Sequence, residues 1–194
     1  NTSGVGTIEH DRIIQPSSIQ TGDCIILNGD IGRHGIAVLA QRQGLEFKSR
    51  IQSDCAALNG IIQDLLDADL DIHCLRDLTR GGLASALVEI SDTAKKHITL
   101  EEATIPVRED VKGACEILGF DPLFVANEGK FIAFVPGIDV EKTLKIMRAH
   151  PLGAESVVIG RVDKDGQSRV IAKNAFGGSR IIDMFSGEQL PRIC

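Results

Sequence analysis

Apolar residues along the chain form two kinds of pattern, separated by glycine, proline and polar residues. Short continuous apolar runs predict buried strands, and apolar sets that repeat every three or four positions predict helices. The expected strands are 24–27, 72–75, 97–100, 130–135, 156–162, 168–172 and 179–182. The expected helices include residues 35–40, an apolar stretch through 58–66 that follows a cap at Ser53 and Asp54, and residues 83–95, 110–118 and 140–149.

The order of these elements indicates the fold class. Strands and helices interleave along most of the chain, but the last two elements are both strands and should pair like a hairpin. That ending favours a mixed sheet over a pure parallel α/β array. We therefore expect an α+β fold of ferredoxin-like type, with a mixed β-sheet and helices mainly on one face.

Three regions of the chain are expected to be organised differently. Residues 1–20 are punctuated by glycine and serine, and we interpret them as a linker from a preceding domain, because the chain also lacks an initiator Met. Residues 21–183 are expected to form one α/β domain. Residues 184–194 should be a flexible arm, since Pro191 disfavours helix there. Fully extended, an arm of this length spans about 30 Å.

Composition narrows the function classes. The chain has 194 residues, 43% of them hydrophobic, and a net charge of -6. This acidic balance argues against a nucleic-acid or anionic-membrane surface, and no apolar run approaches the roughly 20 residues of a membrane span. The five cysteines have neither zinc-site nor disulfide-framework spacing, and Cys24, Cys74 and Cys115 lie in apolar settings that predict core positions. We expect a reducing, cytoplasmic compartment and no metal site.

The sharpest internal motif joins the end of a predicted strand to the start of a helix. It contains Asp77, Thr79, Arg80, Gly81 and Gly82. Glycines at a helix start let the backbone approach an anion, and arginine offers a fork of donors, so the motif fits a phosphate site. The alternative is a tight structural turn in which the aspartate caps the backbone and the arginine is solvated.

Two further clusters are candidates for chemistry. In Asn127-Glu128-Gly129-Lys130, apolar flanks would partly bury the Glu128 carboxylate and make it a general base near neutral pH, or the four residues form a plain turn. In the loop of residues 28–35, Asp30, Arg33 and His34 either line a site or belong to a structural loop.

The last residue is Cys194, a thiol at a chain end. Arg192 favours its thiolate and the adjacent terminal carboxylate disfavours it, so we expect an ordinary thiol whose reactivity depends on the site that receives it. The alternative is that the cysteine has no function and merely marks where the chain stops.

Together, four motifs resemble the HypE family of hydrogenase maturation factors. They are Gly-Asp-Ile-Gly-x-His-Gly, Asp-Leu-Thr-Arg-Gly-Gly-Leu-Ala, Asn-Glu-Gly-Lys and the terminal Pro-Arg-Ile-Cys. The family belongs to the group that contains aminoimidazole ribonucleotide synthetase, selenophosphate synthetase and thiamin-phosphate kinase. The resemblance covers essentially the whole chain and implies the C-terminal domain of that group.

The resemblance implies an ATP-dependent carbamoyl dehydratase. Cys194 would receive a carbamoyl group from the carbamoyltransferase HypF, and ATP would drive loss of water to a thiocyanate, with Glu128 as the base. Cyanide would then pass to iron on the HypC and HypD complex for a nickel-iron hydrogenase. The strand-to-helix motif and Asn127 would lie on the phosphate side of the ATP site.

The resemblance also implies a second domain, absent from this chain, that supplies much of the ATP and Mg²⁺ site and the contact of a homodimer. The chain alone would then be inactive, and could be a monomer. Two other functions stay open: a noncatalytic docking domain that carries a substrate, and a sister ATP-dependent synthetase of the selenophosphate or purine type.

Overall fold

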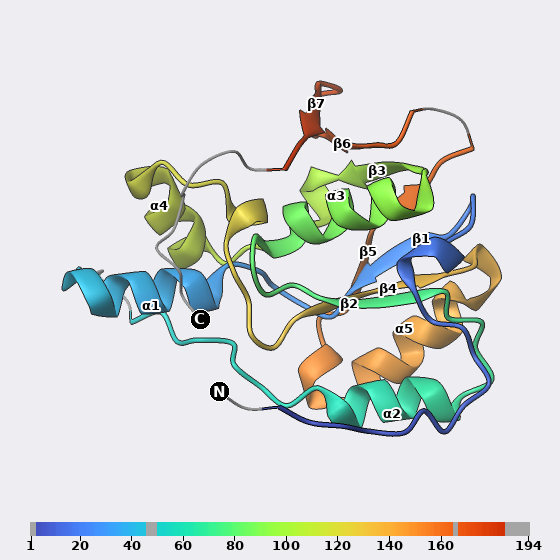
Figure 1. Cartoon of the computed structure of the whole chain (residues 1–194). Coiled ribbons are helices and arrows are strands. Elements are labelled where there is room, and N and C mark those ends of the chain that lie inside the picture. The colour runs from blue at the N-terminus through green and yellow to red at the C-terminus, as the bar shows by residue number, and fades with distance from the viewer. Residues whose placement is uncertain (1–2, 46–49, 165–166, 185–194) are drawn as a thin grey trace.

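A computed structural model describes residues 3–45, 50–164 and 167–184. Within these residues a seven-stranded sheet has the order β2-β4-β1-β5-β3-β6-β7 (Figure 1). The strands are β1 Cys24–Leu27, β2 Cys74–Asp77, β3 His97–Glu101, β4 Phe131–Val135, β5 Val157–Val162, β6 Arg169–Lys173 and β7 Ser179–Ile182. The helices are α1 Arg33–Gln43, α2 Asn59–Asp67, α3 Gly82–Ala94, α4 Glu109–Leu118 and α5 Val140–Ala149.

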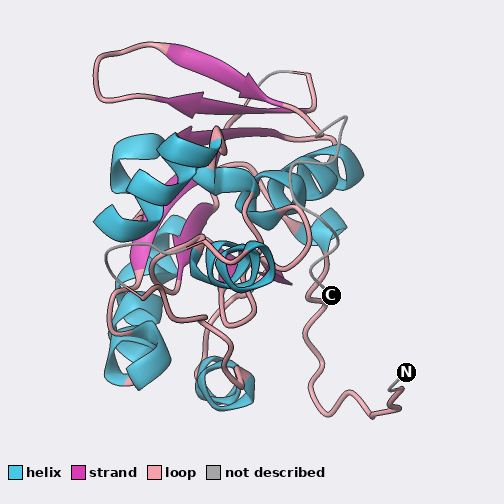
Figure 2. Ribbon diagram, turned by 90° about the vertical axis from the view of Figure 1, so that its left-hand side faces the viewer, coloured by secondary structure: helices cyan, strands magenta, loops and turns pink. Residues whose placement is uncertain are grey.

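The expected α+β fold with a mixed sheet is confirmed, and its ferredoxin-like part can be identified. The elements β1, α2, β2, β4, α5 and β5 follow one another in β-α-β-β-α-β order, and their strands pair antiparallel in the spatial order β5-β1-β4-β2. The parallel pairing of β3 with β6 makes the sheet mixed. The β6–β7 pair is the expected hairpin, and it lies at the top of the molecule in Figures 1 and 2.

The segment between β2 and β4 contains α3, β3 and α4, and it changes which faces of the sheet are covered by helices. Helices α2 and α5 share a hydrophobic cluster on one face, as the ferredoxin-like order requires, whereas α3 packs against the other face. Side chains alternate along β1, so that Ile25 and Leu27 face α3 and Ile26 faces α2 and α5. Helices therefore cover both faces of the central strands, more evenly than the cover mainly on one face that we expected.

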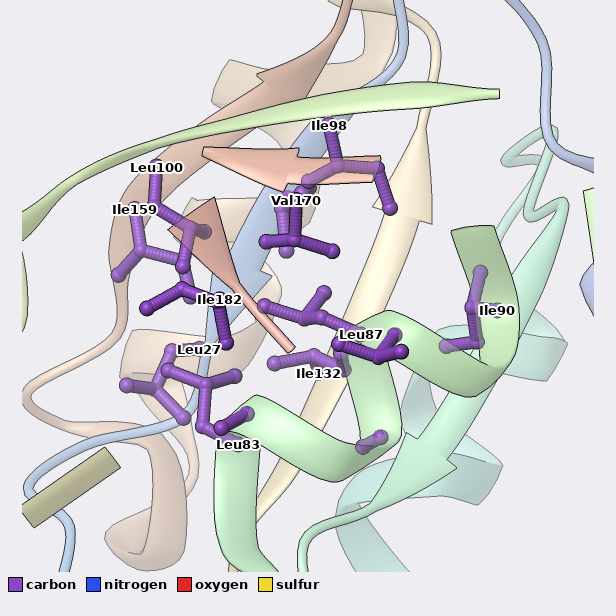
Figure 3. Close-up of a cluster of buried hydrophobic side chains, with 14 of the residues drawn as sticks. Leu27, Leu83, Leu87, Ile90, Ile98, Leu100, Ile132, Ile159, Val170 and Ile182 are labelled. Atoms are coloured by element: carbon purple, nitrogen blue, oxygen red, sulfur yellow. The ribbon is translucent and has the colours of Figure 1, made fainter. Parts of the chain in front are cut away.

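Most of the core lies between α3 and the sheet. Leu83, Leu87 and Ile90 repeat at helical spacing and pack among strand residues that include Ile98 and Val170 (Figure 3). All five are at most 1% exposed. This packing fixes the N-terminus of α3, where the strand-to-helix motif lies.

Two local predictions were wrong. Helix α2 begins only at Asn59, and Leu58, without a capping side chain, precedes it, so Ser53 and Asp54 do not cap it. Cys74 and Cys115 are buried as expected, but Cys24 is only half-buried. No helix in the described ranges is long and apolar enough to cross a membrane.

Candidate functional site

Three polar loops meet beside the N-terminus of α1: residues 28–35, 77–82 and 127–130. The backbone of Leu78 joins the second loop to the third, since its N–H donates to the Lys130 carbonyl at 3.0 Å and its carbonyl accepts from the Asn127 N–H at 3.0 Å. The Asn127 side chain joins the third loop to the first, because its Oδ1 accepts the Gly32 N–H at 2.7 Å. The three internal motifs singled out in the sequence are therefore one structural unit.

Asn127 is the centre of this unit. It is fully buried, and its Nδ2 donates to the carbonyls of Leu78 at 3.1 Å and Val125 at 3.0 Å. Both ends of the amide are therefore engaged within the protein. Asn127 positions the loops, and its assignment to the phosphate side of an ATP site stays a prediction.

The two glycines of the strand-to-helix motif are required by packing. Gly81 and Gly82 have φ angles of 71° and 61°, in the left-handed region that favours glycine. A Cβ on Gly82 would lie 2.6 Å from the carbonyl oxygens of both Leu123 and Val125, and one on Gly81 would overlap the Ser85 side chain. These contacts account for both glycines without a ligand, so their role at a phosphate also stays a prediction.

The polar side chains of the same motif lie at its surface. The Thr79 hydroxyl donates to Asp77 Oδ2 at 2.7 Å, and Asp77 is exposed. The structural alternative foresaw a cap by Asp77, but the N-cap of α3 is Gly81 and receives no side-chain hydrogen bond. Arg80 is exposed, as the structural alternative expected. Arg80 is thus the positive group of this motif that an anion can reach.

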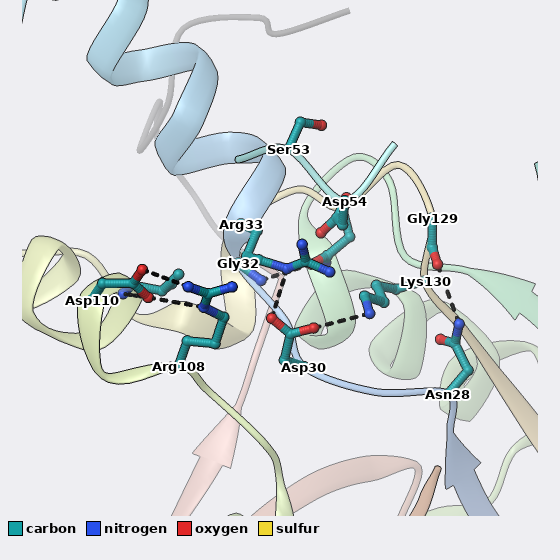
Figure 4. A network of polar contacts seen from close by, with 12 residues as sticks. Asn28, Asp30, Gly32, Arg33, Ser53, Asp54, Arg108, Asp110, Gly129 and Lys130 are labelled. Atoms are coloured by element: carbon teal, nitrogen blue, oxygen red, sulfur yellow. Dashed lines mark hydrogen bonds and ion pairs between the residues drawn. The ribbon is translucent and has the colours of Figure 1, made fainter. Parts of the chain in front are cut away.

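Asp30 and Arg33 belong to a buried ion cluster (Figure 4). Asp30 Oδ2 lies 2.7 Å from Arg33 Nε, and Oδ1 lies 3.0 Å from Lys130 Nζ. The Asp30 and Lys130 side chains are 7% and 9% exposed, so each desolvated charge is paired. The sequence did not assign a role to Lys130, whose partner lies 100 positions away.

His34 lies apart from this ion cluster. Its Nδ1 is 2.9 Å from Ser53 Oγ, which also accepts the Cys55 N–H at 3.1 Å. His34 therefore ties α1 to the segment that precedes α2 rather than to the strand-to-helix motif.

Glu128 is half-buried, and its backbone is held from both sides. Its N–H donates to Asp54 Oδ1 at 2.8 Å. The next carbonyl, that of Gly129, accepts from Asn28 Nδ2 at 3.2 Å, and Asn28 Oδ1 accepts the Phe131 N–H at 2.9 Å. Sequence reasoning missed Asn28 and Asp54; a polar residue directly after the buried strand β1 was the available signal for Asn28.

A salt bridge borders the cluster at the start of α4. Arg108 Nε and Nη2 donate to the two carboxylate oxygens of Asp110 at 3.1 and 2.9 Å. Burial alone would raise the pKa of Asp110, but the hydrogen bonds and charge of Arg108 outweigh it and lower that pKa. Asp110 is therefore ionised at neutral pH and unsuited to donate a proton.

The buried cysteines and the acidic groups offer neither an activated thiol nor a metal site here. Burial raises the pKa of both Cys74 and Cys115 to about 11, so neither is a nucleophile at neutral pH. In the parts of the chain that the structure describes, no group of three or more His, Cys, Asp and Glu residues could hold a metal ion. The described residues therefore form no metal site of three or more protein ligands, whereas Mg²⁺ at a nucleotide is held largely by phosphate oxygens and water. Cys194 lies outside the described residues.

Comparisons with known proteins agree with these motifs. The family model for the C-terminal domain of AIR synthase related protein matches residues 20–173. Over 193 residues the chain is 49% identical to the carbamoyl dehydratase HypE of Rhodobacter capsulatus, covering 100% of this chain and 57% of that protein. The HypE of Cupriavidus necator is 47% identical, over 100% of this chain and 55% of that protein.

Solved structures show the same relationship. A crystal structure of hydrogenase maturation protein HypE has a TM-score of 0.91 and 40% identity, over 96% of this chain and 60% of that one. HypE in complex with ATP has a TM-score of 0.88 and 41% identity, over 93% and 55%. The HypE–HypF complex has a TM-score of 0.83 and 40% identity, over 88% of this chain and 55% of that one.

The chain thus spans somewhat more than half the length of the curated relatives it matches. The matched domain, the seven-stranded mixed sheet and the identity along the whole chain lead to one conclusion. This chain belongs to the family of AIR synthase related proteins, represented by their C-terminal domain, and is similar throughout to HypE.

Proposed function

We propose that this chain is the substrate-carrying part of an ATP-dependent carbamoyl dehydratase that makes the cyanide ligand of nickel-iron hydrogenase. The observation that carries the proposal is the convergence of the three internal motifs on one unit through Leu78 and Asn127, and Glu128 follows Asn127 in that unit. The similarity to HypE over the whole chain supports the reaction, and the HypE–HypF structure supports HypF as the carbamoyl donor.

The proposed reaction begins with a carbamoyl group bonded to the sulfur of Cys194. ATP transfers its γ-phosphoryl group to the carbamoyl oxygen and leaves as ADP, while the nitrogen loses one proton. The C–O bond then breaks, phosphate leaves, and the nitrogen loses its second proton as the C≡N bond forms. The product is a thiocyanate on Cys194. Transfer of cyanide to iron breaks the S–C bond and leaves the Cys194 thiolate, which consumes two electrons that the HypC and HypD complex would supply.

Glu128 is the base in this proposal. A general base must be held in position relative to the proton that it removes. The hydrogen bond from the Glu128 N–H to Asp54 and the one from Asn28 to the Gly129 carbonyl provide this positioning. Glu128 is half-buried, so a proton transfer to it would be partly shielded from water.

Arg80 is our choice for the phosphate contact. Arginine binds phosphate oxygens in a bidentate manner, and Arg80 is exposed next to the Gly81-Gly82 turn. The described residues form no metal site of three or more protein ligands, so we derive no step of this reaction through a metal held by this chain. Nucleotide binding by the whole protein is supported by the structure of HypE in complex with ATP.

The test is mass spectrometry of the full-length protein with HypF, carbamoyl phosphate and ATP. We expect a carbamoyl adduct on Cys194 that then loses water. Glu128→Gln should stall at the carbamoyl form, whereas Glu141→Gln, at an exposed position of α5, should react normally. Both adducts persisting in Cys194→Ala would refute the carrier role, and normal dehydration by Glu128→Gln would remove Glu128 from the mechanism.

A further inference from the structure

Asp54 has a carboxylate oxygen without a partner. The residue is only 6% exposed, and its Oδ1 accepts the Glu128 N–H at 2.8 Å. Its Oδ2 is buried and receives no hydrogen bond in the described part of the chain. A buried acceptor without a donor is destabilising, and a charged one is more so. Such an atom calls for a donor that the described residues do not supply.

The position of this oxygen is set by a close backbone approach. A Cβ on Gly129 would overlap the Asp54 carbonyl oxygen and would lie 3.0 Å from the Ala56 Cβ. Only glycine lets the segment after residue 53 come this near to the Glu128–Gly129 peptide. The approach places the Asp54 carboxylate against the main chain of Glu128, the residue proposed as the base.

Dehydration of the carbamoyl group requires two proton transfers from its nitrogen. The group R–S–C(=O)–NH₂ carries two N–H bonds, and R–S–C≡N carries none, so both protons must leave. A single glutamate that has taken the first proton must lose it before it can take the second. A second carboxylate beside the first removes that delay.

We propose that Asp54 is a catalytic residue for the nitrogen of the carbamoyl group. Its Oδ2 accepts the N–H that remains after Glu128 has taken the first proton, and it takes that second proton as the C–O bond breaks and phosphate leaves. This proposal rests on the proposed dehydratase function. It assigns the unpartnered oxygen of Asp54 a donor, the N–H of the substrate carried by Cys194.

The test compares two substitutions in the full-length protein. Asp54→Asn keeps the shape and an oxygen that accepts the Glu128 N–H, but it replaces the second oxygen with an NH₂ donor. We expect normal carbamoylation of Cys194 and a loss of water at least about 100-fold slower, within the range for a lost general base. Asp54→Glu keeps a displaced carboxylate and should be slower than the unmodified protein but faster than Asp54→Asn. Asp64→Asn, exposed on α2, is the matched control.

The outcomes separate this proposal from the proposed function. Dehydration at the unmodified rate by Asp54→Asn overturns the role of Asp54, whereas the function stands if Glu128→Gln still stalls. Equal slowing by both substitutions, in step with a lower melting temperature or poor carbamoylation, also overturns it, because that pattern marks a structural role. If Asp54→Asn does not fold, Asp54→Glu decides alone, and an unmodified rate overturns the proposal. No loss of water from Cys194 in the unmodified protein refutes the dehydratase function itself.

Discussion

Replacing Asn127 with alanine should destabilise the protein strongly. The side chain is fully buried and makes three hydrogen bonds, to the Gly32 N–H and to the carbonyls of Leu78 and Val125. Each bond contributes about 0.5–1.5 kcal/mol net, and the buried Gly32 N–H left without a partner adds about 1–3 kcal/mol. Together these contributions give about 2.5–7.5 kcal/mol, so we expect the free energy of unfolding to fall by at least about 2.5 kcal/mol, a large share of the roughly 5–15 kcal/mol of a typical domain.

The measurement is urea denaturation followed by circular dichroism, with the slope m checked for constancy. The control is Asn59→Ala at the exposed first residue of α2, which should change stability by less than about 0.5 kcal/mol. A loss below about 1 kcal/mol for Asn127→Ala would refute the reasoning, because it would mean that water replaces the amide at all three partners. It would also remove the main link between the three loops.

Two further predictions concern backbone geometry and pH. Gly82→Ala should lower the free energy of unfolding in urea by at least about 2 kcal/mol, because the φ of Gly82 is 61° and a Cβ would meet the Leu123 carbonyl. The control Gly113→Ala, with open space in α4, should raise it by about 0.5–1 kcal/mol. Equal effects of the two substitutions would contradict this prediction. Burial alone would lower the pKa of His73, but the hydrogen bond and charge of Asp23, at 2.8 Å, outweigh it and raise that pKa. The stability that protonated His73 contributes is therefore complete below about pH 6.5 and is lost as pH rises through the raised pKa, so His73→Gln should cost more at about pH 6 than at about pH 9. Equal costs at both pH values would show that the charge of His73 is not involved.

Most elements of the fold could be predicted because their signals are local. Helix α5 has the expected bounds, Val140–Ala149, and the final strand pair forms the expected hairpin. Alternation and helical spacing depend on neighbours within a few positions, which the sequence displays directly. The start of α2 was misplaced because Asp54 resembles a cap, and its actual partner, Glu128, is 74 positions away.

The candidate site was predicted in part. The sequence indicated which loops carry polar and glycine residues, and the three internal motifs do meet. It did not indicate that Asn127 is fully buried, nor that the two glycines are required by the approach of another backbone. Glycine at a left-handed turn and glycine at a ligand look alike in sequence, because both need only the absence of a side chain.

The residue types, their local periodicity and the positions of the turns were properties of the linear chain, and they were enough for the α+β class and for the choice of motifs. The partners of Asp30, Asp54 and Asn127 depended on folding, which brings together loops separated by about 50 to 100 positions. Burial and pairing of a charge depend on everything packed around it, and no short window of sequence contains that information. The buried oxygen of Asp54 that has no partner among the described residues was therefore visible only once the segment after residue 53 lay against the Glu128–Gly129 peptide.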